Sequence, residues 1–322
     1  MPRLTELNDV LFPVEEHRVF VSVLNGKAER RLPVPGKKGI VNAKSEQVLG
    51  IVSDGYRLVT NQQALDWGVE CCRTVFPETK PGEWNVTATD APSTAGYCHI
   101  DLRHNSTALD FKDLPAAERP DVFGPFIRVT NSYNALRALS FDIGFYRKVC
   151  KNGMIIPDTI IRFSFTHQRR DIGETIQFKV EHDRLTRFRT MFTDSLAGLR
   201  ACLVSRPQFD PLIRGVLLLR SPGPIETATR KADDWQALGS HLDEMTTRYT
   251  RDLGENAYAA FNVITEFASH PLVSRCVRRD RNSFQRLAGS WLSTFSQECR
   301  KPGFSVAKYL EDQAKSTKPE NQ

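Results

Sequence analysis

Hydrophobic and polar residues alternate in many short segments of the first half of the chain, a pattern typical of half-buried β-strands. Two of these segments run into tight-turn signals: His17–Leu24 precedes Asn25-Gly26, and Leu49–Ser53 precedes Asp54-Gly55. Asn-Gly and Asp-Gly supply the positive φ angles that two-residue hairpin turns require. We therefore expect two N-terminal hairpins, the second continuing into Tyr56–Thr60.

The proline- and glycine-rich segment Pro33–Gly39, between these hairpins, is expected to be an exposed loop. Further along, Arg103–Pro125 is polar and contains proline, and is also expected to be a surface loop. Asn152-Gly153 predicts a turn between two short strands, Tyr146–Cys150 and Met154–Ile156. The other strands expected from alternation are residues 84–89, 96–102, 126–130, 139–146, 161–165 and 175–180.

Helical spacing of apolar residues occurs once early in the chain and dominates its last part. Asn61 is expected to cap a helix that Pro77 ends. After Asp183, apolar residues recur at three- and four-residue steps, and further helices are expected at about 231–251, 256–269 and 282–300. The order predicts an α+β fold, with an N-terminal and central antiparallel β-rich part and one or two packed helices, followed by a C-terminal helical part. We expect a β-rich α+β domain at 1–182, a helical region at 183–313 that packs on it or forms a subdomain, and a flexible tail at 314–322.

Positive charge is concentrated in the middle of the chain. Residues 1–125 contain 14 basic and 17 acidic residues, residues 126–214 contain 15 and 8, and the remainder contains 15 and 13. A locally basic segment in a chain of net charge +6 suits a phosphate backbone, although solvated surface charge also produces such imbalances.

Several classes of protein lack their signals here. The 7 cysteines include no C-x2-C pair and the 7 histidines no H-x3-H pair, so neither a zinc site nor another metal cofactor is expected. Phosphate-binding glycine loops are missing, which argues against an ATPase or dinucleotide enzyme. Without a secretory leader or a long apolar run, we expect a cytoplasmic protein that does not enter membranes.

Cys150, beside Lys151, is the one residue that suggests nucleophilic catalysis, because neighbouring cations favour a thiolate. The Asn152-Gly153 turn explains the same residues more simply, and no base can be placed next to Cys150 from the sequence. We therefore expect no enzymatic activity.

Three segments, in this order, resemble the landmarks of a known family: Phe126–Tyr133, Tyr146–Met154 and Gly254–His270. The region from Gly50 to Trp67 is also similar. The family is the phage- and plasmid-borne domain of unknown function 932, and the resemblance covers roughly residues 15–300. Its name implies no activity, but its occurrence on mobile elements, where single-strand annealing proteins are frequent, implies a role in recombination, replication or maintenance of a phage or plasmid.

Basic and aromatic side chains are interleaved in the central segment, as single-stranded nucleic-acid binding requires. The candidate binding residues are Arg128, Tyr133, Arg137, Tyr146, Arg147, Lys148, Lys151, Arg162, Arg184 and Arg187. The alternative is a basic sheet face that is merely solvated. A later run, Arg275, Arg278, Arg279, Arg281 and Arg286, can extend a phosphate groove or be a solvated linker and helix start.

The expected function is nucleic-acid binding, with single-stranded DNA as the first choice of ligand and annealing as the possible outcome. Because annealing proteins work as rings or filaments, we also expect a homo-oligomer. The alternative is a protein-interaction or host-modulating factor of a mobile element that binds no nucleic acid and uses its C-terminal helices as the contact surface.

Overall fold

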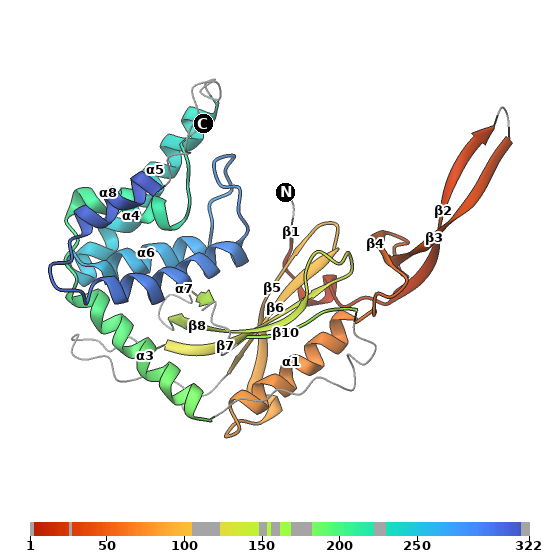
Figure 1. Cartoon of the computed structure of the whole chain (residues 1–322), viewed down its shortest axis with the longest axis horizontal. Coiled ribbons are helices and arrows are strands. Elements are labelled where there is room, and N and C mark those ends of the chain that lie inside the picture. Colours follow the sequence, from red (N-terminus) through yellow and green to blue (C-terminus); the bar gives the residue numbers. More distant parts are fainter. Residues whose placement is uncertain are drawn as a thin grey trace. The chain divides into compact units, whose positions relative to one another are not determined.

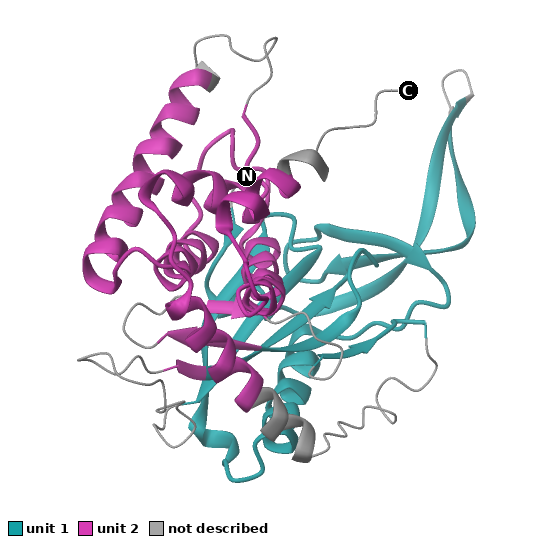
Figure 2. Ribbon diagram, turned by 60° about the vertical axis from the view of Figure 1, so that its left-hand side comes forward, with its two compact units in different colours: residues 1–108, 125–143, 158–182 teal, residues 109–124, 144–157, 183–322 magenta. Residues whose placement is uncertain are grey.

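The chain forms two compact units in a computed structural model (Figure 2) that describes residues 3–25, 28–104, 123–147, 153–155, 162–168, 182–221 and 230–316. Unit 1 comprises residues 1–108, 125–143 and 158–182, and unit 2 comprises residues 109–124, 144–157 and 183–322. The units are defined by spatial contacts alone. The prediction of a β-rich domain at residues 1–182, with a helical region at 183–313 packed on it or forming a subdomain, therefore stays a prediction.

Antiparallel sheets build most of unit 1 (Figure 1). The larger sheet has the strand order β1-β5-β6-β7-β8-β10, with β9 paired to the end of β8, and the smaller has the order β2-β3-β4. The strands are β1 (Arg3–Leu4), β2 (Val14–Asn25), β3 (Ala28–Asn42), β4 (Val48–Ser53), β5 (Trp84–Pro92), β6 (Tyr97–His104), β7 (Phe123–Ser132), β8 (Leu139–Arg147), β9 (Gly153–Ile155) and β10 (Arg162–Phe165). The alternating segments at residues 84–89, 96–102, 126–130 and 139–146 are thus confirmed as strands.

The first predicted hairpin exists but is longer than expected. The prediction that Pro33–Gly39 forms a loop is wrong, because these residues lie within β3. Only Lys37–Val41 of β3 pair with β4, so Pro33 belongs to a stretch that pairs with β2 alone. Proline is tolerated on such an edge because its missing N–H interrupts no second ladder.

The segment after Asp54-Gly55 also differs from the prediction. Tyr56–Thr60 form no strand, and helix α1 (Asn61–Val75) follows them. Thr60, not Asn61, is the N-cap, and its side chain accepts a hydrogen bond from the Gln63 N–H. The Asn61 side chain is buried and donates to the Val10 carbonyl oxygen instead, at 2.8 Å. Tertiary packing therefore decided between two adjacent residues that both have good capping side chains.

The core of unit 1 joins the smaller sheet to the loop after β7. Ile40, Leu49, Val52, Tyr56, Ala95 and Tyr133 form one buried cluster. Gly50 of β4 lies so close to this loop that an added Cβ would meet the Tyr133 carbonyl oxygen and the Asn134 Cα, each at 2.6 Å. Both atoms belong to backbone, which cannot turn aside as a flexible side chain does.

Gly50→Ala is therefore expected to lower the free energy of unfolding by about 1–3 kcal/mol, the usual cost of overpacking a filled site. Chemical denaturation followed by circular dichroism measures this loss. Gly55→Ala is the matched control, because nothing lies within 4 Å of a Cβ at that position. Equal stability of the two variants would contradict the close approach at Gly50.

Unit 2 is helical in most of its described part. Its helices are α3 (His182–Ala201), α4 (Arg206–Val216), α5 (Arg230–Leu253), α6 (Ala257–Ser269), α7 (Arg281–Glu298) and α8 (Val306–Ser316). Nearly every residue of α6 is buried, and its Phe267 packs edge-on against Phe284 of α7 with ring centroids 5.4 Å apart. Helix α6 is therefore the centre of this unit.

The helices expected after Asp183 and at 231–251, 256–269 and 282–300 are confirmed, which establishes the α+β fold class. Helices α4 and α8 are not expected from the sequence. Two prolines discourage a helix over α4, but Pro207 stands in its first turn, where proline is compatible with a helix.

The predicted tail begins inside α8 at 314, and residues 317–322 lie outside the described residues, as does the strand expected at 175–180. No described helix combines the length and apolarity that a membrane crossing needs.

Candidate functional site

Arg128 of β7 was predicted to bind nucleic acid, but its side chain is buried and paired and so is not open to a ligand. Its Nε and Nη2 donate to the two carboxylate oxygens of Asp101 on β6 over 2.6 and 2.7 Å, and both side chains are 2% exposed. The two residues are cross-strand partners and so point to the same face. Burial alone would lower the pKa of Arg128, but the charge and hydrogen bonds of Asp101 raise it above its ordinary value.

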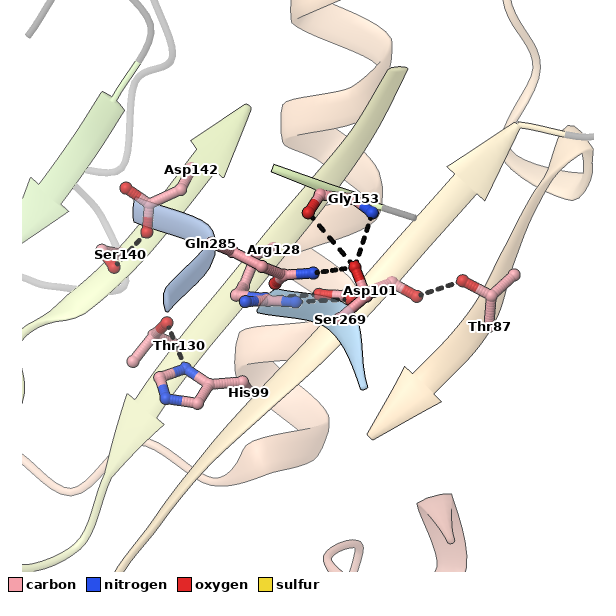
Figure 3. Close-up of polar contacts among 10 residues, drawn as sticks. All are labelled: Thr87, His99, Asp101, Arg128, Thr130, Ser140, Asp142, Gly153, Ser269 and Gln285. Carbon is pink, nitrogen blue, oxygen red and sulfur yellow. Dashed lines mark hydrogen bonds and ion pairs between the residues drawn. The ribbon is translucent and has the colours of Figure 1, made fainter. Parts of the chain in front are cut away.

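Strands β6, β7 and β8 carry further buried polar pairs (Figure 3). His99 Nδ1 lies 2.8 Å from the Thr130 hydroxyl, another cross-strand pair, and the Ser140 hydroxyl donates to Asp142 over 3.1 Å. The Arg162 Nε lies 3.1 Å from the Asp142 Oδ1, and the Arg162 side chain is 42% exposed. These contacts join polar side chains within unit 1, which makes this a structural network of largely buried groups.

Tyr133 and Tyr146 do not present their rings for stacking, which corrects the prediction. Tyr133 is fully buried and its hydroxyl accepts a hydrogen bond from the Asn61 N–H over 2.9 Å. Tyr146 is buried in unit 2, with its ring against Gly124, where an added Cβ would meet the hydroxyl at 2.9 Å. Both tyrosines fill cores, and the interleaved pattern that suggested base stacking is produced by packing.

The remaining candidates fall into three groups. Arg137 is exposed, with its guanidinium 5.4 Å from the centre of the Tyr97 ring. Arg147 is half-buried and donates to the Asn262 Oδ1 of α6 over 3.0 Å. Lys148 and Lys151 lie outside the described residues, as does Cys150, and Arg184 and Arg187 lie in α3 with side chains that the structure does not describe. The ten candidates therefore do not form one exposed surface in the described part of the chain.

A different set of basic residues does gather around a hollow, in unit 2. A pocket of about 470 Å³ is lined by Arg220, Arg275, Arg278 and Arg279, together with Leu217, Leu218, Leu219, Ser221, Cys276 and Phe284. Three of these arginines belong to the basic run noted in the sequence. Arg220, from another part of the chain, could not be assigned to the same site from any sequence signal.

Local backbone structure explains how the two segments form this pocket. After α4, Leu218 adopts a left-handed conformation with φ of 52°, and the Leu219 N–H donates to the Arg214 carbonyl oxygen over 2.9 Å. This reversal places Leu219 to Ser221 on the pocket wall. The other lining segment is the loop that ends at Asp280, whose side chain caps α7 by accepting from the Ser283 N–H over 2.8 Å.

The pocket is strongly cationic. All four arginines are exposed, and none of the described residues that line it is acidic. Arg220, Arg275 and Arg279 form no ion pair among the described residues. The Asp234 carboxylate lies near Arg275, but it accepts a hydrogen bond from the backbone N–H of Arg275 over 3.2 Å and not from the guanidinium. The first turn of α7, which contributes Phe284, adds the partial positive charge of a helix N-terminus.

This arrangement is suited to binding anions. Guanidinium groups present several N–H donors in a planar fork that matches phosphate oxygens. The volume lies within the range of small-molecule pockets, large enough for one or two phosphate-bearing units. No general base lines the pocket, and no cluster of three metal-binding side chains occurs among the described residues.

Comparison with known families assigns the chain as a whole. A family model described as "Domain of unknown function (DUF932)" matches residues 48–291. The chain belongs to this family. The resemblance noted in the sequence is thereby confirmed. The matched residues include all those that line the pocket around Arg220 and Arg275, which we call the arginine pocket, but the match begins after strands β2 and β3. Nothing among curated proteins or among solved structures matches the chain.

Proposed function

We propose that this DUF932 family member is a non-enzymatic nucleic-acid-binding protein that holds the phosphates of single-stranded DNA in the arginine pocket. The observation that carries the proposal is the convergence of four exposed arginines on one hollow without an acidic lining residue. The planar fork of an arginine pairs with two oxygens of one phosphate, and four such groups at one hollow suit the repeated phosphates of a nucleic-acid backbone.

The shape of the pocket favours a single strand over a duplex. A recessed site of about 470 Å³ can admit a phosphate and its flexible neighbours. The backbone of a stiff duplex follows a fixed path and cannot fold into such a hollow. Exposed aromatic rings, which often assist single-strand binding, are missing from the described lining of the pocket, so the attraction is expected to be mainly electrostatic.

We propose that this binding serves recombination, replication or maintenance of a phage or plasmid in the cytoplasm. That placement rests on the family resemblance. Self-association is part of the proposal, because annealing proteins act as rings or filaments. A mass measurement with and without DNA tests the oligomer, and mixing complementary labelled strands tests whether binding leads to annealing.

A salt titration of a labelled oligonucleotide is the direct test of binding. If about four phosphates are neutralised, the logarithm of the binding constant should fall with the logarithm of the salt concentration with a slope of roughly −3. Fluorescence anisotropy with a single-stranded oligonucleotide measures this slope, and polyglutamate serves as a control polyanion without phosphates. Failure to bind the oligonucleotide at low salt would sink the proposal and favour a protein-interaction role.

A further inference from the structure

The distal part of the β2–β3 hairpin is a ribbon of two strands, and no third strand of the described residues pairs with it. We call residues 18–33 the ribbon arm. Strand β4 pairs only with Lys37–Val41 of β3, so the arm extends past β4 within unit 1 (Figure 1). Every described side chain at residues 20–24 and 29–33 is exposed.

Such exposure is unusual for the residues concerned. Large apolar side chains lie open to solvent on the arm, with exposed fractions of 50% for Phe20, 53% for Val21 and 78% for Leu24. A two-stranded ribbon is only marginally stable in water unless a third element or a partner covers it. The composition and the exposure together indicate an interaction surface.

Both faces of the arm combine apolar and cationic groups. Cross-strand partners point to the same side, so Phe20 with Pro33, Ser22 with Arg31 and Leu24 with Glu29 define one face. The other face has Val21 with Leu32 and Val23 with Arg30. Each face therefore carries an arginine, so a partner that contacts either face meets a cation.

The charge of the arm favours a polyanion as the partner. Its sequence contains four basic residues, Arg18, Lys27, Arg30 and Arg31, and one acidic residue, Glu29. Glu29 accepts a hydrogen bond from the Ser22 hydroxyl over 2.6 Å. Arg18, Arg30 and Arg31 are exposed and form no ion pair among the described residues. Two such arms would repel each other, which disfavours pairing between the arms of two copies.

We propose that the ribbon arm inserts into the major groove of duplex DNA. The major groove of B-form DNA, about 12 Å wide, admits a two-stranded β-ribbon. The arginines would contact the phosphates at its rims and the base edges, and the apolar residues would contact thymine methyl groups. The inference goes beyond the proposed function, because it assigns a different form of nucleic acid to a different unit, and neither site depends on the other.

The test compares two variants of the full-length protein on two ligands. Arg30→Ala/Arg31→Ala is expected to weaken binding of a labelled blunt-ended DNA duplex about tenfold or more and to reduce its salt slope by about 2. Binding of a single-stranded oligonucleotide should be unchanged. Arg275→Ala/Arg279→Ala, in the pocket, should weaken binding of the single-stranded oligonucleotide and leave binding of the duplex unchanged. Anisotropy on the same protein samples reads both ligands, so failure of the arm and failure of the pocket are separated.

Two controls complete the design. Lys44→Ala/Arg73→Ala removes the same charge from exposed positions of unit 1 outside the arm and should leave both affinities unchanged. An RNA duplex should bind more weakly than DNA, because the major groove of A-form RNA is too narrow for a ribbon. Duplex affinity that is the same for Arg30→Ala/Arg31→Ala and for wild type would overturn the proposal. It would equally be overturned if the arm variant lost self-association or binding to anionic vesicles while it kept duplex binding.

Discussion

Simultaneous replacement of Arg220, Arg275 and Arg279 by alanine is expected to weaken binding of single-stranded DNA by about 100-fold or more. Hydrogen bonds to charged groups contribute roughly 1.5–3 kcal/mol each, and three of them lost at one site exceed the 2.8 kcal/mol or so that corresponds to a 100-fold change. The slope of the salt dependence should also become shallower by about 2, because three fewer phosphates are neutralised. Fluorescence anisotropy over a range of salt concentrations measures both quantities.

The control for this variant removes three cations from other exposed positions: Arg73, Arg251 and Lys301, each of which has an acidic neighbour. If affinity depended only on net charge, the two triple variants would bind equally weakly. A pocket-specific site predicts near wild-type affinity for the control. Stability of the pocket variant should be little changed, because substitutions of exposed, unpaired side chains usually alter unfolding by less than about 0.5 kcal/mol.

Asp101→Asn is expected to have the largest effect on stability, a loss of about 3–5 kcal/mol in the free energy of unfolding. The substitution removes the negative charge that compensates Arg128, whose guanidinium is buried to the same extent. Asp90 and Asp142 also act on Arg128 through their charge, but Asp101 contributes most. A buried cation that loses its bidentate carboxylate costs far more than the ion pair contributes. Urea denaturation monitored by circular dichroism measures the loss.

Two further variants separate this explanation from a general effect of removing a carboxylate. Asp54→Asn changes an exposed residue and should leave stability within about 0.5 kcal/mol of wild type. Asp101→Leu/Arg128→Met removes both charges and should be more stable than Asp101→Asn, because apolar residues often replace a buried pair without loss. If the double variant were as unstable as Asp101→Asn, the uncompensated charge would not be the cause.

Local pattern sufficed for much of the fold because the period of the apolar residues distinguishes a strand from a helix. Strand β8 alternates Leu139, Phe141, Ile143 and Phe145 with smaller or polar residues, and it lies in a sheet as expected, but both of its faces are buried, where the alternation predicted a half-buried strand. Helix α6 begins after Asn256, whose side chain accepts from the Ala259 N–H as an N-cap should. These elements have one strong local preference each, and their surroundings agree with it.

The local sequence pattern did not predict the structure correctly where the same residues are compatible with two different structures. Pro33–Gly39 has the composition of a loop, and only the partner strand β2 makes it part of a ribbon. Arg128 and Tyr133 have the composition of a nucleic-acid-binding strand, yet Asp101 and Asn61 satisfy them within the core. A sequence shows that a residue is basic or aromatic, but its partners come from distant segments.

The sequence by itself determined the α+β order of the chain, its family and the presence of a basic run at Arg275–Arg279. Those properties follow from short-range periodicity and from residue identity. Only the tertiary structure decided which arginines are open to a ligand. It buried Arg128 against a carboxylate from the neighbouring strand, and it brought Arg220 beside Arg275 across a pocket. The physical reason is that charge is a property of one residue, whereas its desolvation, pairing and convergence are properties of the packed chain.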